Sequence, residues 1–92
     1  MDINKIYRNK SKFVVREVGN ELILVPLTGN IAKMNEMFTM NETGKFIWEN
    51  IEENTTVENL VEKLVSEFQV DESIARADTE KFIQQVSSQL IK

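Results

Sequence analysis

The hydrophobic pattern of this 92-residue chain changes its period near residue 41, and this change constrains the fold more than any other feature. Before it, two apolar runs at 13–18 and 21–27 flank a Gly19-Asn20 pair, which is a signal for a two-residue hairpin turn. After it, apolar residues recur at helical spacing. Strands grouped first and helices second favour an α+β fold over a parallel α/β sheet.

The first part of the chain predicts a three-stranded antiparallel sheet. The two apolar runs form the hairpin, and Pro26 marks an edge or the end of its second strand, because proline cannot donate to a ladder. We expect a third strand over 37–40. Two interpretations remain open for residues 31–34: a further short strand, or an irregular approach to the third strand.

The second part predicts three helices. Asn41 is an expected N-cap for a helix over 42–52, and Thr55 and Glu58 have capping-box spacing before the next helix. That second helix has the cleanest stripe in the chain, formed by Val57, Leu60, Val61, Leu64, Val65 and Phe68. Asp71 is expected to cap a third helix that runs to near the C-terminus.

One charged residue interrupts the apolar pattern of the third helix. Ile74, Phe82, Val86 and Leu90 step by four or eight residues, and Asp78 falls in line with them. Because a buried unpaired charge is costly, Asp78 has two interpretations. It lies at the edge of the stripe with its hydrogen bonds satisfied, or it faces a groove and positions a bound segment.

The composition excludes most catalytic chemistry. The chain has no cysteine and no histidine, which excludes disulfides, thiolate chemistry, histidine-based catalysis and the common zinc sites. It also carries no phosphate-binding loop and no dinucleotide fingerprint. We therefore expect a protein that is not an enzyme and that uses no metal and no cofactor.

Charge and hydropathy narrow the range of partners. The net charge of -4 argues against nonspecific nucleic-acid binding, and the longest apolar run, 22–27, is too short to cross a bilayer. We expect a cytoplasmic protein that contacts neither nucleic acid nor membrane. Five of the 11 basic residues lie within the first 16 positions, which predicts a flexible basic arm over 1–12 before a domain over 13–92. The alternative is an arm that docks on an acidic partner or on the acidic body of the chain itself.

Residues 40–48 carry a recognisable motif. They read Met-Asn-Glu-Thr-Gly-Lys-Phe-Ile-Trp, which resembles the Leu-Asn-x-Thr-[Gly/Ala]-x-x-Ile-Trp signature of the pyrroloquinoline quinone biosynthesis protein D family, the PqqD-like proteins. Phe68-x-Val70, the Ala77-Asp78 pair and Phe82 agree more weakly. The resemblance covers residues 13–92, and the 28–40 connection is longer than is usual in the family.

The resemblance implies a small winged-helix-like domain, with a three-stranded antiparallel sheet followed by three helices. It also implies a peptide-recognition module, or peptide chaperone, of a pathway that modifies ribosomally made peptides. Such a module binds the leader segment of a precursor peptide by β-strand addition and presents it to a modifying enzyme, often a radical S-adenosylmethionine enzyme. The leader pairs with the edge of the third strand and lies against the last helix.

Helical spacing extends this implied site along the last helix. We expect Thr79, Ile83 and Val86 to form an exposed wall, with Asp78 and Phe82 at its base. The complete expected peptide-binding set is Met37, Phe38, Thr39, Met40, Asp78, Thr79, Phe82, Ile83 and Val86.

Two other functions remain as alternatives. One is a winged-helix DNA-binding protein, although the last helix mixes basic and acidic residues. The other is a scaffold that tethers an enzyme without binding a peptide. A free edge strand also permits pairing between copies, so we expect a monomer or a weak dimer.

Overall fold

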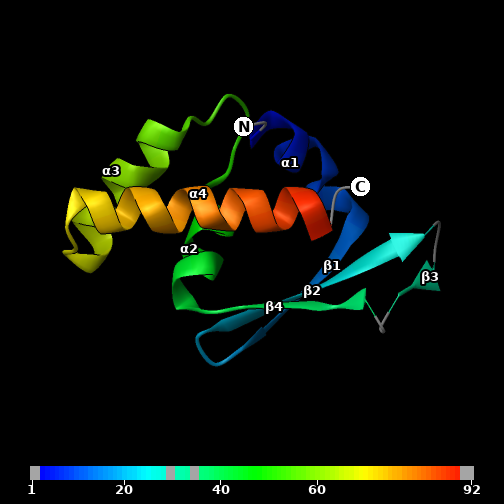
Figure 1. Ribbon diagram of the computed structural model, residues 1–92. Coiled ribbons are helices and arrows are strands. Elements are labelled where there is room, and N and C mark those ends of the chain that lie inside the picture. Colours follow the sequence, from blue (N-terminus) through cyan, green and yellow to red (C-terminus); the bar gives the residue numbers. More distant parts are fainter. Residues whose placement is uncertain (1–2, 29–30, 34–35, 90–92) are drawn as a thin grey trace.

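The computed structural model describes residues 3–28, 31–33 and 36–89 of the chain (Figure 1). The elements in chain order are α1 (Ile3–Asn9), a 3-10 turn η1 (Lys10–Lys12), β1 (Phe13–Val18), β2 (Glu21–Thr28), β3 (Ile31–Ala32), β4 (Phe38–Met40), α2 (Glu42–Asn50), α3 (Val57–Phe68) and α4 (Glu72–Gln89). The helices lie on one face of the sheet, and α4 extends along it (Figure 1). The predicted α+β class is confirmed, and α1 is added to the expected elements. Of the two interpretations of residues 31–34, β3 bears out the further short strand for residues 31–32.

The sheet is antiparallel and is centred on β2. β1 pairs with β2 through a hairpin whose Gly19 has a φ of 61°, a conformation that glycine adopts without steric cost. β4 pairs with residues 22–24 of β2, and β3 pairs with residues 27–28 at its other end. In the described ranges, no strand pairs with the outer side of β4.

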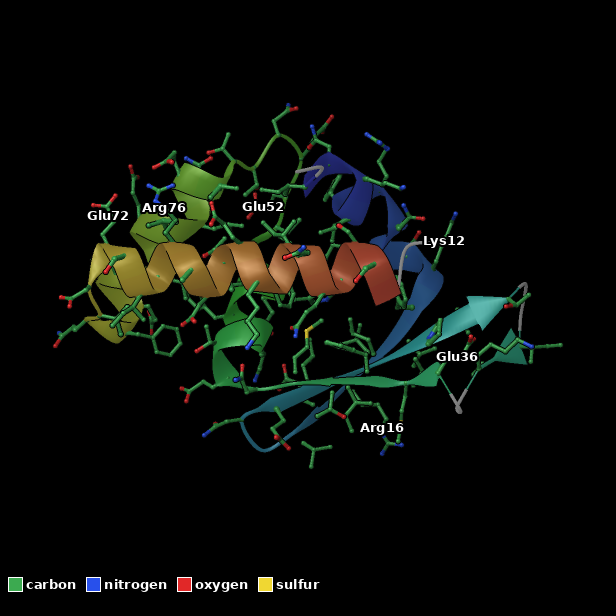
Figure 2. All side chains as sticks on the ribbon, in the orientation of Figure 1. Lys12, Arg16, Glu36, Glu52, Glu72 and Arg76 are labelled. Carbon is green, nitrogen blue, oxygen red and sulfur yellow. The ribbon has the colours of Figure 1, made fainter. Side chains whose placement is uncertain are left out.

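The two faces of the sheet have different surroundings. Leu22, Leu24 and Met40 point toward the helices and are buried. On β1, Arg16 pairs with Ile23, which lies between Leu22 and Leu24 and therefore points to the other face. Arg16 accordingly lies on the side of the sheet opposite the helices (Figure 2). Beyond Phe13, however, β1 is exposed on both faces: Val14 is 43% exposed and Val15 is 45% exposed. The core therefore lies between a single sheet face and the helices.

The Asn41 cap predicted from the sequence is confirmed. The backbone N–H of Gly44 donates to Asn41 Oδ1 at 2.9 Å, and α2 begins at the next residue, Glu42. Further along the helix, Trp48 is buried and meets the ring of Phe13 edge-on, with centroids 5.9 Å apart. The indole thus connects α2 to the start of β1.

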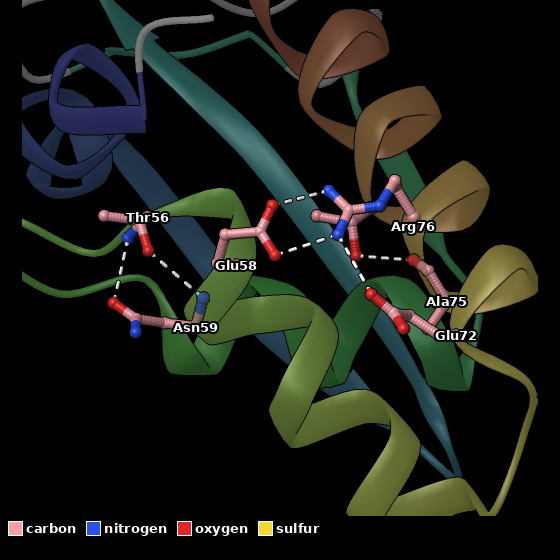
Figure 3. A network of polar contacts seen from close by, with 7 residues as sticks. Thr56, Glu58, Asn59, Glu72, Ala75 and Arg76 are labelled. Carbon is pink, nitrogen blue, oxygen red and sulfur yellow. Dashed lines mark hydrogen bonds and ion pairs between the residues drawn. The ribbon is translucent and has the colours of Figure 1, made fainter.

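The capping box of α3 lies one residue later than predicted. Thr56 is the N-cap: its hydroxyl accepts from Asn59 N, and the Asn59 side chain accepts from Thr56 N (Figure 3). Thr55 instead closes the preceding turn, where its hydroxyl accepts from Glu52 N at 2.9 Å. Asparagine replaces the usual glutamate at the third helical position, and for that reason the Thr55–Glu58 spacing was misleading.

An ion-pair network joins α3 to α4. Both oxygens of the Glu58 carboxylate accept from the Arg76 guanidinium, at 2.6 and 2.8 Å, and Glu72 accepts a further bond at 3.2 Å (Figure 3). The hydrogen bonds from Arg76 lower the pKa of the Glu58 carboxyl, while those from Glu58 and Glu72 raise the pKa of Arg76. The network is exposed, so we expect it to orient the helices more than to stabilise them.

The expectation of a flexible arm over residues 1–12 is wrong for residues 3–12. Ile3 and Ile6 lie three residues apart on α1, and both are buried in the same core as Trp48. Asn4 Oδ1 also accepts from the backbone N–H of Asn54 at 2.9 Å. The basic residues of this segment predicted a flexible arm, but its two isoleucines at helical spacing determine where it lies.

Lys10 fixes the segment that follows α1. Its ammonium donates to the backbone carbonyls of Trp48 and Ile51, at 2.8 and 3.1 Å, where α2 ends. A cation at a helix C-terminus satisfies carbonyls that have no partner within the helix. Burial lowers the pKa of Lys10, and the nearby Glu52 and Glu49 carboxylates oppose this shift.

The last helix has a buried flank and an exposed flank. The buried flank comprises Ala75, Thr79, Ile83 and Val86. Ile74, predicted to belong to the apolar stripe, is 50% exposed. Leu90 lies outside the described residues.

No helix in the described part of the chain is long and apolar enough to cross a membrane.

Candidate peptide-binding site

The outer edge of β4 is the first component of the candidate site. Thr39 is exposed, Phe38 is partly buried against the core, and Met40 is buried. Met37 precedes the strand and is 54% exposed. An unpaired edge of this kind presents backbone N–H and C=O groups to an extended segment.

A small pocket adjoins the end of β4, between the first turns of α2 and the middle of α4. Its volume is about 180 Å³, smaller than the roughly 300–1,000 Å³ of pockets that enclose drug-sized ligands. The pocket is therefore suited to a single side chain. We call it the α2–α4 pocket, and it is lined by Asn41, Thr43, Gly44, Ile47, Asp78, Lys81, Phe82 and Gln85.

Gly44 connects the strand edge to the floor of this pocket. A Cβ placed on Gly44 would lie 3.1 Å from Met40 Cβ and 3.5 Å from Phe82 Cδ2. The contact to Met40 is tighter than ordinary van der Waals packing, so β4, α2 and α4 converge at this glycine. The missing side chain lets the first turn of α2 approach the end of β4 closely.

The wall that α4 contributes to the pocket is polar. Asp78, Lys81 and Gln85 follow one another at helical spacing and are all exposed. In the described part of the chain, neither Asp78 nor Lys81 forms an ion pair. We call this row, together with Ile74 four residues before Asp78, the groove flank of α4.

Part of the predicted site lies in the core. Thr79 and Val86 are fully buried and Ile83 is 1% exposed, so the exposed wall predicted from these residues is wrong. The Thr79 hydroxyl donates to the Ala75 carbonyl at 2.8 Å, which satisfies its polar atom without a ligand. The apolar spacing of these residues indicated the side of α4 that packs on the protein.

The structure brings three of the predicted residues together at the α2–α4 pocket. Phe82 forms part of its floor, Asp78 lies at its rim, and Met40 packs beneath Gly44. Asp78 thus lies at the edge of the apolar stripe and also faces a hollow, so each of its two interpretations describes part of its position.

Sequence reasoning missed several residues of the pocket: Thr43, Gly44, Ile47, Lys81 and Gln85. A signal for two of them was available. Lys81 and Gln85 lie three and seven residues after Asp78, which places all three on one flank of a helix. The described residues contain no group of three or more acidic, histidine or cysteine side chains that is arranged to hold a metal ion.

The family model described as coenzyme PQQ synthesis protein D (PqqD) matches residues 21–90. The chain belongs to the PqqD family. The match includes both sides of the α2–α4 pocket and the whole of β4, and it confirms the resemblance seen at residues 40–48.

A solved structure shares the fold of this PqqD-family chain. It is described as TbiB1 in complex with the TbiA(beta) leader peptide, and it aligns with a TM-score of 0.67 over 86% of each chain. The two sequences are 22% identical, so the likeness shows the fold. A comparison with curated protein sequences finds no match.

Proposed function

We propose that this PqqD-family protein binds the leader segment of a ribosomally made precursor peptide, which adds as a strand to the outer edge of β4. The observation that carries the proposal is the outer edge of β4, which no strand of the described residues pairs with, beside the α2–α4 pocket. The fold is also that of a protein solved with a leader peptide. Backbone hydrogen bonds supply affinity in this mode of binding, and side-chain pockets supply specificity.

The charges on α4 favour a peptide over DNA. A winged-helix protein that reads DNA needs cations free to contact phosphates. Arg76 is already held by Glu58 and Glu72, and Lys81 lies beside Asp78 on the groove flank. The exposed surface of α4 therefore does not form a basic stripe.

The proposal extends to a second partner. The bound leader is presented to a modifying enzyme, for which a radical S-adenosylmethionine enzyme is our first candidate. The family's description as a protein of coenzyme synthesis supports a role in a biosynthetic pathway. A scaffold that tethers the enzyme without a peptide would need neither the free edge of β4 nor the pocket beside it.

Peptide binding is tested by titrating isotope-labelled full-length protein with a candidate precursor, a short peptide encoded near the gene. We expect the largest amide shifts at residues 37–44 and at Asp78, Lys81 and Gln85. The opposite edge of the sheet, residues 14–18 of β1, serves as an internal control and should shift little. Shifts confined to β1, or no saturable shift, would contradict the proposed site.

The presenting role is tested separately. The candidate enzyme is assayed on its precursor with and without this protein, and again with the leader segment removed from the precursor. We expect modification to depend on both the protein and the leader. Modification that needs the protein but not the leader would instead support the scaffold alternative.

A further inference from the structure

The register of the sheet determines which residues of an added strand face the helices. Phe38 pairs with Leu24 and Met40 pairs with Leu22, and both pairs lie on the helix side of the sheet. Thr39 pairs with Ile23, on the other side. Because side chains alternate along strands, a strand added at β4 places one residue beside Met40 and another, two positions away, beside Phe38.

These two positions have different surroundings. Beside Met40, the chain turns directly into Asn41 and α2, so a neighbouring side chain lies at the mouth of the α2–α4 pocket. Beside Phe38 it meets an aromatic ring that is packed against the core but only partly covered. Binding would complete the burial of this ring, which favours an apolar residue at that position.

The rim of the pocket requires a polar partner. Asp78 and Lys81 have no ion-pair partner in the part of the chain that the structure describes, and both are exposed to solvent. An apolar side chain placed over them would remove water from two charges without replacing its hydrogen bonds. A side chain with donors and acceptors keeps them satisfied, while its aliphatic stem contacts Ile47 and Phe82 on the floor.

We propose that the protein selects its peptide by a two-position code, in which a hydrogen-bonding residue enters the α2–α4 pocket and a large apolar residue covers Phe38. Asp78 and Lys81 determine the specificity at the first position. The three strand pairs among the described residues are antiparallel, and an added strand that follows them runs opposite to β4. The hydrogen-bonding residue therefore comes first in the peptide, and the apolar residue follows two positions later. This inference rests on the proposed function.

The code is tested with a display library of 12-residue peptides selected on the full-length protein. We expect enrichment of a hydrogen-bonding residue two positions before a large apolar one. Two synthetic peptides from an enriched sequence, which differ only by glutamine or leucine at the first position, then provide the measurement. We expect the wild-type protein to bind the glutamine peptide about tenfold more tightly, because leucine leaves buried polar groups unmatched.

Paired variants assign the preference to its residues. The Asp78→Ala/Lys81→Ala double variant should reduce the difference between the two peptides to about threefold or less, because it removes both charges from the rim. The matched control is Glu80→Ala/Lys63→Ala, which also removes one acid and one base. Glu80 is exposed and points away from the groove flank, and Lys63 is exposed on α3. This control should keep the full difference.

Each contrary result has a distinct meaning. Equal affinity of the wild-type protein for the two peptides, or a difference that survives in Asp78→Ala/Lys81→Ala, would overturn the code and leave peptide binding intact. Selection of the apolar residue before the polar one would overturn the antiparallel register. If no selected peptide shifts the amides of residues 38–40, both the code and the proposed site are wrong.

Discussion

The two flanks of α4 differ in what they contact, although both belong to one regular helix. The buried flank, Ala75, Thr79, Ile83 and Val86, is covered by the rest of the protein. The groove flank, Ile74, Asp78, Lys81 and Gln85, is exposed, and its last three residues line the α2–α4 pocket. The charged residues Asp78 and Lys81 lie on the groove flank, but the uncharged residue types do not separate the two flanks, since each contains an isoleucine and an uncharged polar residue.

For the isoleucines and the uncharged polar residues, position around the helix determines burial more than residue type does. Thr79 is polar and fully buried because its hydroxyl donates to the Ala75 carbonyl one turn earlier. Ile74 is apolar and exposed because it lies on the side that faces away from the core. A protein that binds a peptide along a helix needs both kinds of flank, one that anchors the helix and one that remains available.

The sharpest test of the comparison places the same charge on each flank. Ile83→Glu introduces a carboxylate at a site that is 1% exposed, and we expect it to lower the free energy of unfolding by more than about 4 kcal/mol. Ile74→Glu makes the same change where the side chain is half exposed, and should alter stability by only about 0.5 kcal/mol. Thermal unfolding followed by circular dichroism measures both variants.

The pair of variants also distinguishes between the two assignments of the flanks. If Ile83→Glu melts like the wild type while Ile74→Glu unfolds, the buried and groove flanks have been exchanged. If both variants unfold, the groove flank contributes to the core, and it is not available to a peptide.

A second test concerns α1, which completes the core that the buried flank joins. Ile6 is fully buried in this core, so Ile6→Ala should destabilise the protein by roughly 2–5 kcal/mol. Arg8→Ala, on the exposed side of α1, is the control and should change stability by only about 0.5 kcal/mol. Chemical denaturation gives both values. A wild-type midpoint for Ile6→Ala would restore the interpretation of residues 3–12 as a detached arm.

Most of the fold was predictable from local signals. The Gly19-Asn20 hairpin, the Asn41 cap and the stripe of α3 each depend on residues close together in the sequence, and all three are confirmed. The position of α1 was missed because a seven-residue helix with two buried isoleucines gives a weak periodic signal beside five basic residues. Its burial depends on distant partners, which local patterns do not show.

The candidate site was predictable only in part. The strand at residues 38–40 and the involvement of Asp78 follow from pattern and family resemblance. The choice of flank depends on how α4 is rotated against the sheet, and tertiary packing sets that rotation. The Met40–Gly44–Phe82 convergence likewise joins three elements, and no spacing within one element predicts it.

The smallest expected effect concerns the end of α4 that faces α3. The hydrogen bonds from Arg76 hold the pKa of Glu58 below its ordinary value, so the folded state favours the ionised carboxylate. The resulting stabilisation is present at neutral pH and is lost as the pH falls through the lowered pKa of Glu58. The melting temperature of Arg76→Gln should therefore lie slightly below that of the wild type at pH 7, and the two melting temperatures should converge at pH values below the ordinary pKa of glutamate.

The control is Lys63→Gln, which removes an exposed cation from α3 and should show no such convergence. A gap for Arg76→Gln that persists unchanged in acid would mean that Arg76 stabilises the helix pair by packing its aliphatic stem, and not by pairing with Glu58.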